Sequence, residues 1–227
     1  MTGVREAKMY YQIKALVLNA QTHNEHDKQV TLYSYQWGKI KAVVPSAKKI
    51  TAKLSAATEP LTESEFMVFQ SHPSMRPKIT GALIINNNTD VKTDFIKNLY
   101  ALYAAEICDK FAPFNLEHFE KYDLLSRVWE VLGQTKTPKR VLTAFALRFL
   151  KLSGYSYAEY LKNNPELDGE TQKTIRMLSN CSGDDLECFN TVDDDRIWNF
   201  VESYMTTYIK RPSVGVFLKK ISGLYFV

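Results

Sequence analysis

The sequence contains few of the residues that build disulfide scaffolds, low-complexity chains or membrane spans. Its 227 residues include 3 cysteines, 9 glycines and 8 prolines. Because the cysteines are few and odd in number, they fit a reducing cytosol better than a disulfide framework. The low content of glycine and proline excludes a collagen-like chain. There is no run of about 18 uncharged apolar residues and no basic segment followed by an apolar core at the start, so we expect neither a membrane span nor a secretory signal.

The motifs of several common enzyme classes are also missing. The chain has no phosphate-binding loop of the type G-x-x-x-x-G-K or G-x-G-x-x-G, no G-x-S-x-G turn and no H-E-x-x-H helix. Its 4 histidines leave little material for a histidine-based acid–base site. We therefore expect a protein that is not an enzyme.

Three clusters of possible metal ligands have simpler explanations. His23 and His26 accompany two carboxylates in a loop between strands, and a metal there stays an open but unspecific alternative. Cys181 and Cys188 are too far apart for a zinc knuckle. The three acids at 193–195 open a helix, where they would cap its first turn and meet the positive end of its dipole. We expect no metal and no cofactor.

Positive charge is concentrated near the N-terminus. Residues 1–80 carry 11 basic and 6 acidic side chains, an excess of five, although the whole chain has a net charge of only +4. The window 28–58 contains six lysines and no acid. A one-sign field of this kind attracts phosphates, and the alternative is a solvated lysine-rich face that only aids solubility. A second acid-free stretch, 131–158, includes Arg140 and Arg148.

The first third of the chain predicts a small β-barrel. Alternating β-forming residues indicate strands at 10–18, 29–35, 39–44, 65–70 and 79–85, separated by a turn at Gly38, by prolines and by the loop 72–77. Five short strands in so few residues suit a closed OB-fold barrel. Tyr33, Tyr35 and Trp37 share one parity, so they cannot be divided between core and surface without a bulge.

From residue 87 onwards the hydrophobic period becomes helical. We expect helices at 90–112, at 116–133 and from the Thr137-Pro138 pair to Gly154, with the Thr137 hydroxyl as a cap. Two or three short helices follow, then a long one from the acids at 193–195 to Lys210 and a terminal helical segment at 213–222. The fold class is therefore α+β: a five-stranded OB-fold barrel over 1–86 and an all-α domain over 87–227.

Several short motifs, in this order, resemble the bacterial recombination mediator family RecO. They are an acid-x-acid turn at 25–27, VTLYS at 30–34, GKI at 38–40, a basic segment at 44–49, LSGY at 152–155 and YIKRPS at 208–213. The chain departs from that family in two places. The four-cysteine zinc motif is absent from 156–169, and the basic segment lacks its glycine.

The resemblance implies an N-terminal OB-fold, a helical C-terminal domain and a non-enzymatic, cytoplasmic and nucleoid-associated role in DNA repair. Proteins of that family bind single- and double-stranded DNA and anneal complementary strands. With RecR and single-stranded-DNA-binding protein they load the RecA recombinase. This chain would then have those partners and no membrane partner.

We expect DNA to lie on the barrel, with phosphates held by lysines and bases stacked on exposed aromatic rings. The expected contacts are Lys28, Lys39, Lys41, Lys48, Lys49, Lys53, Tyr35 and Trp37. On the helical domain, Arg140 and Arg148 are our candidates for the acidic C-terminal tail of single-stranded-DNA-binding protein, since eight residues apart they could edge one groove. The alternative is a protein-interaction adaptor whose basic OB-fold contacts acidic partners.

Overall fold

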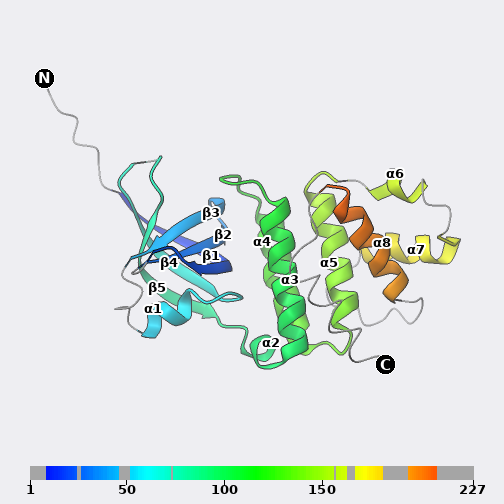
Figure 1. Cartoon of the computed structure of the whole chain (residues 1–227), viewed down its shortest axis with the longest axis horizontal. Helices are drawn as coiled ribbons and strands as arrows, with labels where there is room; N and C mark the ends of the chain where they lie inside the picture. The colour runs from blue at the N-terminus through cyan, green and yellow to red at the C-terminus, as the bar shows by residue number, and fades with distance from the viewer. Residues whose placement is uncertain are drawn as a thin grey trace, which may run out of the picture. The chain divides into compact units, whose positions relative to one another are not determined.

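A computed structural model describes residues 9–24, 27–45, 52–72, 74–155, 157–162, 167–180 and 194–208 (Figure 1). The chain divides into two compact units. The first holds Met1–Asn87 and Ala112–Tyr122, and the second holds Asn88–Phe111 and Asp123–Val227. The segment 112–122, which the sequence led us to include in the helical domain, therefore packs with the strands of the first unit.

The first unit contains the five expected strands, which close into a barrel. They are β1 (Met9–Thr22), β2 (Lys28–Ser34), β3 (Gly38–Val44), β4 (Glu63–Gln70) and β5 (Lys78–Asn86). Their order around the barrel is β1-β2-β3-β5-β4, and β4 pairs back with β1. All pairings are antiparallel except that of β3 with β5. The OB-fold prediction is confirmed.

Alternation along the strands fills the barrel. Val30 and Leu32 of β2 and Ile40 and Ala42 of β3 point inward and are at most 5% exposed. Tyr33 lies on the opposite face of β2. Because successive residues of a strand face opposite sides of the sheet, one register places the whole apolar set in the core.

The three aromatic residues of shared parity have different environments. Tyr33 is 1% exposed and Tyr35 is 42% exposed, while Trp37 is partly buried against the barrel core. No bulge separates them. Strand β2 ends at Ser34, and the turn that follows frees Tyr35 and Trp37 from strand alternation.

A short helix that the sequence did not predict lies between β3 and β4. This helix, α1 (Ala52–Ala57), has the sequence AKLSAA, and the Thr58 hydroxyl donates to the Leu54 carbonyl, 2.9 Å away, at its end. Six residues are too few to show a helical hydrophobic period, so the pattern carried no signal there.

The second unit is helical, as predicted. Its helices are α2 (Thr89–Thr93), α3 (Phe95–Phe111), α4 (Phe119–Gln134, whose first turn belongs to the first unit), α5 (Pro138–Leu152), α6 (Tyr157–Lys162), α7 (Gly169–Leu178) and α8 (Asp194–Thr206). Helix α5 is buried along most of its length and packs against α3, α7 and α8. Among the helices that the structure describes, none combines the length and the apolar character needed to cross a membrane.

One expected helix is divided in two, and one expected helix cap is not formed. The single helix expected over 90–112 is divided at Asp94, whose backbone is extended. The Asp94 carboxylate caps α3 by accepting hydrogen bonds from the N–H groups of Ile96 and Lys97. Thr137 does precede α5, but its hydroxyl makes no capping bond and lies 3.3 Å from the Thr135 hydroxyl. The terminal segment 213–222 lies outside the described residues.

Ion pairs with α5 use the acids that open α8. The Asp194 carboxylate accepts two hydrogen bonds of 3.0 Å from the Arg140 guanidinium, and Asp195 pairs with Lys139. These acids therefore tie α8 to α5. Asp168 caps α7 in the ordinary way, and the hydrogen bond from the Thr171 N–H lowers the pKa of the Asp168 carboxyl.

The turn between β2 and β3 requires a glycine for two reasons. Gly38 has a φ of +65°, and an ideal Cβ there would lie 1.9 Å from the Leu116 carbonyl oxygen. Segment 112–122 can therefore approach the barrel closely only because residue 38 has no side chain.

We predict that Gly38→Ala destabilises the protein far more than Gly154→Ala. Both glycines have positive φ, but a Cβ at Gly154 would meet nothing within 4 Å. Gly154→Ala should cost about 1 kcal/mol from backbone strain, and Gly38→Ala should cost about 3 kcal/mol or more because backbone must also move. Denaturant unfolding measures both values. Equal losses of unfolding free energy in the two variants would show that the close approach of Leu116 does not restrict residue 38.

Candidate nucleic-acid interface

The outer face of β3 presents two lysines in different environments. Lys39 and Lys41 alternate with the core residues Ile40 and Ala42, so both side chains leave the barrel on the same face. Lys41 is exposed, whereas Lys39 is only 5% exposed. Equal spacing in the sequence thus gives one solvent-facing cation and one covered cation.

Segment 112–122 covers Lys39. The backbone of Phe114 forms an isolated parallel β-bridge with that of Lys39. The Asn115 N–H donates to the Lys39 carbonyl at 2.9 Å. The Lys39 ammonium lies 4.2 Å from the centre of the Phe114 ring, and that of Lys41 lies 5.6 Å from it. Both distances are within the range of cation–π attraction. We therefore remove Lys39 from the expected phosphate contacts and keep Lys41.

A second cation reaches the same face from the loop between β4 and β5. The Val43 N–H donates to the Pro77 carbonyl, which fastens this loop to the edge of β3. Arg76 then crosses to β2, where its guanidinium donates to the Gln29 side chain at 2.8 Å. Gln29 lies directly across from Val43. Val43 is the next residue after Lys41 on the same face of β3. Arg76 and Lys41 therefore form a cationic pair on the β2–β3 face.

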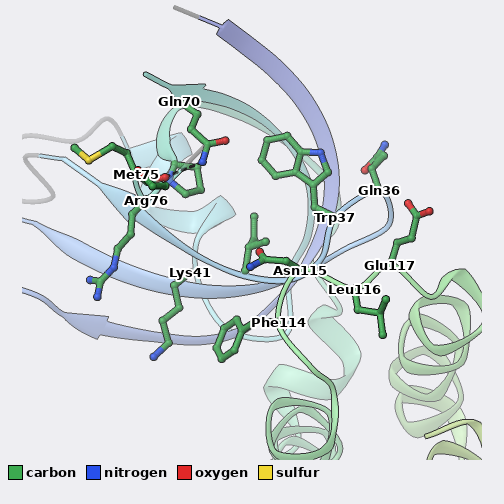
Figure 2. Close-up of a pocket in the computed structure, with 13 residues that line it drawn as sticks. Gln36, Trp37, Lys41, Gln70, Met75, Arg76, Phe114, Asn115, Leu116 and Glu117 are labelled. Carbon is green, nitrogen blue, oxygen red and sulfur yellow. Dashed lines mark hydrogen bonds between the residues drawn. The ribbon is translucent and has the colours of Figure 1, made fainter. Parts of the chain in front are cut away.

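A pocket of about 790 Å³ opens beside this pair. Its walls come from the turn at Trp37, from Lys41, from the loop at Gln70 and Arg76 and from segment 112–122 at Phe114 (Figure 2). Figure 2 shows the Trp37 and Phe114 rings in different walls of the pocket. Glu117 is the one acid among the described residues that line it. The site thus combines two cations, two aromatic rings and a concave surface.

The other expected DNA contacts lie elsewhere or outside the described residues. The Lys28 ammonium is 2.9 Å from the Glu59 carboxylate, and the Tyr35 ring packs edge-on against Tyr122 at 5.3 Å. Lys48 and Lys49 lie outside the described residues, as does the side chain of Lys53. The pair Lys28–Glu59 is at the surface, where such ion pairs are weak and readily exchanged.

Sequence reasoning missed Arg76 and Phe114. A signal for Arg76 was available, because it lies in the loop between the fourth and fifth strands, which OB-folds use for binding. Phe114 had none. It follows a long helix in the chain and reaches β3 only through the folding of segment 112–122.

A buried carboxylate anchors the far end of segment 112–122. The Glu63 side chain is 6% exposed and lies 2.8 Å from the Lys14 ammonium, and the Tyr122 hydroxyl donates to the same carboxylate at 2.9 Å. Tyr122 also stacks on Tyr33 with ring centres 6.4 Å apart. The segment that carries Phe114 therefore contacts the barrel near its middle, at Gly38, and is anchored at its last residue by Glu63.

The two arginines expected to bind an acidic tail lie on α5 in the helical unit. Arg140 is engaged by Asp194, and its side chain is only 13% exposed. An incoming carboxylate at Arg140 would therefore have to displace Asp194. Arg148 is partly buried.

Metal ligands do not gather in the described residues. No group of three or more histidine, cysteine, aspartate or glutamate side chains there could hold a metal ion. Cys108 is buried and is not part of a disulfide. His26, Cys181, Cys188 and Asp193 lie outside the described residues, so the expectation of no metal stays a prediction at those positions.

Comparison with known proteins finds one family along most of the chain. Residues 9–87 match the family profile described as "Recombination protein O N terminal", and residues 92–160 match "Recombination protein O C terminal". The DNA repair protein RecO of Geobacter metallireducens is 30% identical over 144 residues, which cover 63% of this chain and 57% of that protein. That of Clostridium perfringens is 28% identical over 141 residues, or 62% and 56%. The matched part is little more than half the length of these curated relatives.

We predict that Tyr122→Phe lowers the free energy of unfolding by about 2 kcal/mol, because it removes a hydrogen bond to a buried carboxylate. Tyr35→Phe is the matched control, since among the described residues its hydroxyl has no hydrogen-bond partner. That control should change stability by less than about 0.5 kcal/mol. Urea unfolding compares the two variants, and equal values would argue against the anchoring role of Tyr122.

Proposed function

Because the chain belongs to the recombination protein O family, we propose that it is a DNA-binding recombination mediator in DNA repair. In this proposal it binds single- and double-stranded DNA and anneals complementary strands. With RecR it helps load RecA onto DNA coated by single-stranded-DNA-binding protein. None of these steps requires a catalytic group.

The cationic pair beside two aromatic rings is the observation that supports DNA binding most directly. Lys41 and Arg76 offer positive charge on the β2–β3 face that OB-folds use for nucleic acids. Phosphate contacts fix the position of a strand without reading its sequence, and aromatic rings accept any base by stacking. This combination favours single-stranded DNA bound with little sequence preference.

Annealing follows from the same electrostatics. Two complementary strands repel each other through their phosphates, and a surface that neutralises one strand lowers that repulsion. Positive charge also raises the rate of encounter with a second polyanion. The surface needs only to hold one strand while the other pairs with it.

The partner contacts belong to the helical unit in this proposal. An arginine beside an apolar helix face suits the terminal carboxylate of an acidic tail. Arg148 on α5 is the candidate that we test for that contact. Arg140, the other candidate, binds the Asp194 carboxylate of its own chain.

We predict that replacing Lys41 and Arg76 together by glutamine weakens binding to a single-stranded oligonucleotide at least tenfold at moderate salt. The slope of log affinity against log salt concentration should become less negative by about 1.4, because two phosphate contacts disappear. The matched control replaces Lys136 and Lys173, two exposed lysines of the helical unit, by glutamine. It removes the same charge and should leave both values unchanged.

Fluorescence anisotropy at four or five salt concentrations measures these slopes. Equal slopes for the double variant and the control would place the DNA elsewhere. Failure of the unaltered protein to bind DNA at moderate salt would favour the adaptor hypothesis instead.

We predict that Arg148→Glu weakens binding of a labelled peptide from the acidic tail of single-stranded-DNA-binding protein at least fivefold. Charge reversal turns an attraction for the tail carboxylates into repulsion. Arg127→Glu, on the exposed side of α4, is the control and should bind the peptide normally. Equal peptide affinities for the two variants would remove Arg148 from the site.

A further inference from the structure

One edge of β3 is only partly paired. Along its other edge, β3 pairs with β2 over its whole length. On the side facing the pocket, its described contacts are two separate bridges, Val43 with Lys78 and Lys39 with Phe114. Lys41 lies between these two bridges, and no β-bridge of its own is formed on this side within the described residues.

The backbone of Lys41 faces this gap. The Val43 N–H and the Lys39 carbonyl both point away from β2, since they bond to Pro77 and Asn115. Every second residue of a strand directs its N–H and C=O to the same edge, so Lys41 directs both groups toward the pocket. Within the described part of the chain, neither group has a hydrogen-bond partner.

We infer that this gap is a pocket for one unstacked base of a single DNA strand, which hydrogen-bonds to the N–H and C=O of Lys41. The inference rests on the proposed function and specifies its ligand. Unstacked bases of single strands are recognised through hydrogen bonds to their edges and by stacking on aromatic rings. The pocket holds both elements, since Trp37 and Phe114 lie in its walls (Figure 2).

The chemistry of the edge suits every base. Adenine, guanine, cytosine and thymine each carry a hydrogen-bond donor next to an acceptor, and so does one exposed peptide edge. A backbone pair therefore binds a base without selecting its identity. This agrees with phosphate contacts that also ignore sequence.

The flanking chains limit what can enter. An extended peptide adds to a sheet edge through a ladder of several residues, but Phe114 and Pro77 already occupy the neighbouring positions on either side of Lys41. A single planar group with two adjacent polar atoms fits between them. The core residue Ile40 also lines the pocket, so the gap reaches into the barrel wall.

The base and its phosphate would use different parts of the same residue. The Lys41 ammonium is on the outer face beside Phe114, and Arg76 follows along that face. A strand whose phosphates lie on Lys41 and Arg76 can therefore turn one base inward to the Lys41 backbone.

The test compares Lys41→Pro with Lys41→Val. Both variants lose the ammonium, but only proline removes the N–H, and proline is tolerated on a strand edge that makes no ladder bond. Two twelve-nucleotide probes of equal charge are used: oligothymidine and a strand of abasic sites. The measured quantity is the ratio of their affinities, which isolates the contribution of the bases.

We expect the two variants to lose similar affinity for the abasic strand. The ratio should be the same for Lys41→Val as for the unaltered protein and five- to tenfold lower for Lys41→Pro, since one hydrogen bond to the base is lost. Equal ratios for the two variants would overturn the base pocket while leaving phosphate binding intact. Failure of both probes to bind the unaltered protein would overturn the proposed function itself.

A second measurement covers the case in which Lys41→Pro does not fold. Trp129 and Trp198 are buried in the helical unit, at 0% and 8% exposure, whereas Trp37 lines the pocket. Oligothymidine should quench the fluorescence of the unaltered protein more than the abasic strand does, and Trp37→Phe should abolish that difference. Equal quenching by both probes would overturn the inference.

Discussion

The surface of the barrel depends on one backbone contact, the close approach of Gly38 to the Leu116 carbonyl. If residue 38 had a side chain, segment 112–122 could not pack closely against β3. With glycine there, Phe114 covers Lys39, lies beside Lys41 and builds one wall of the pocket. The hydrogen bond from Tyr122 to Glu63 anchors the last residue of the segment. A turn glycine and a buried carboxylate thus determine the shape of a surface to which neither contributes a side chain.

The sequence predicted the barrel and most helices because their hydrophobic residues recur with clear periods, two along strands and three to four along helices. It did not distinguish Lys39 from Lys41, which have the same parity and similar neighbours. The difference arises from Phe114, which is distant in the chain, so no local pattern contains it. Helix α1 was too short to show a period, and Arg76 lay beyond the acid-free window although its loop was identified.

Net charge along the chain also proved a coarse guide to available charge. Within the first unit, Lys14 and Lys28 are matched by Glu63 and Glu59. In the second unit, Asp194 takes both hydrogen bonds of the Arg140 fork. A charge paired in this way adds little to the outer field, and a partly buried pair mainly fixes how two helices pack. Among the described residues, Lys41 and Arg76 keep a patch of positive charge on the β2–β3 face.

A binding site that holds a single base has a consequence for annealing. A protein that stacked every base of a strand on its surface would hide the edges that a complementary strand must reach. If the barrel holds phosphates on Lys41 and Arg76 and turns only one base inward, the neighbouring bases keep their pairing edges exposed. The gap in β3, one residue wide, is therefore suited to holding a strand in a form that can still pair.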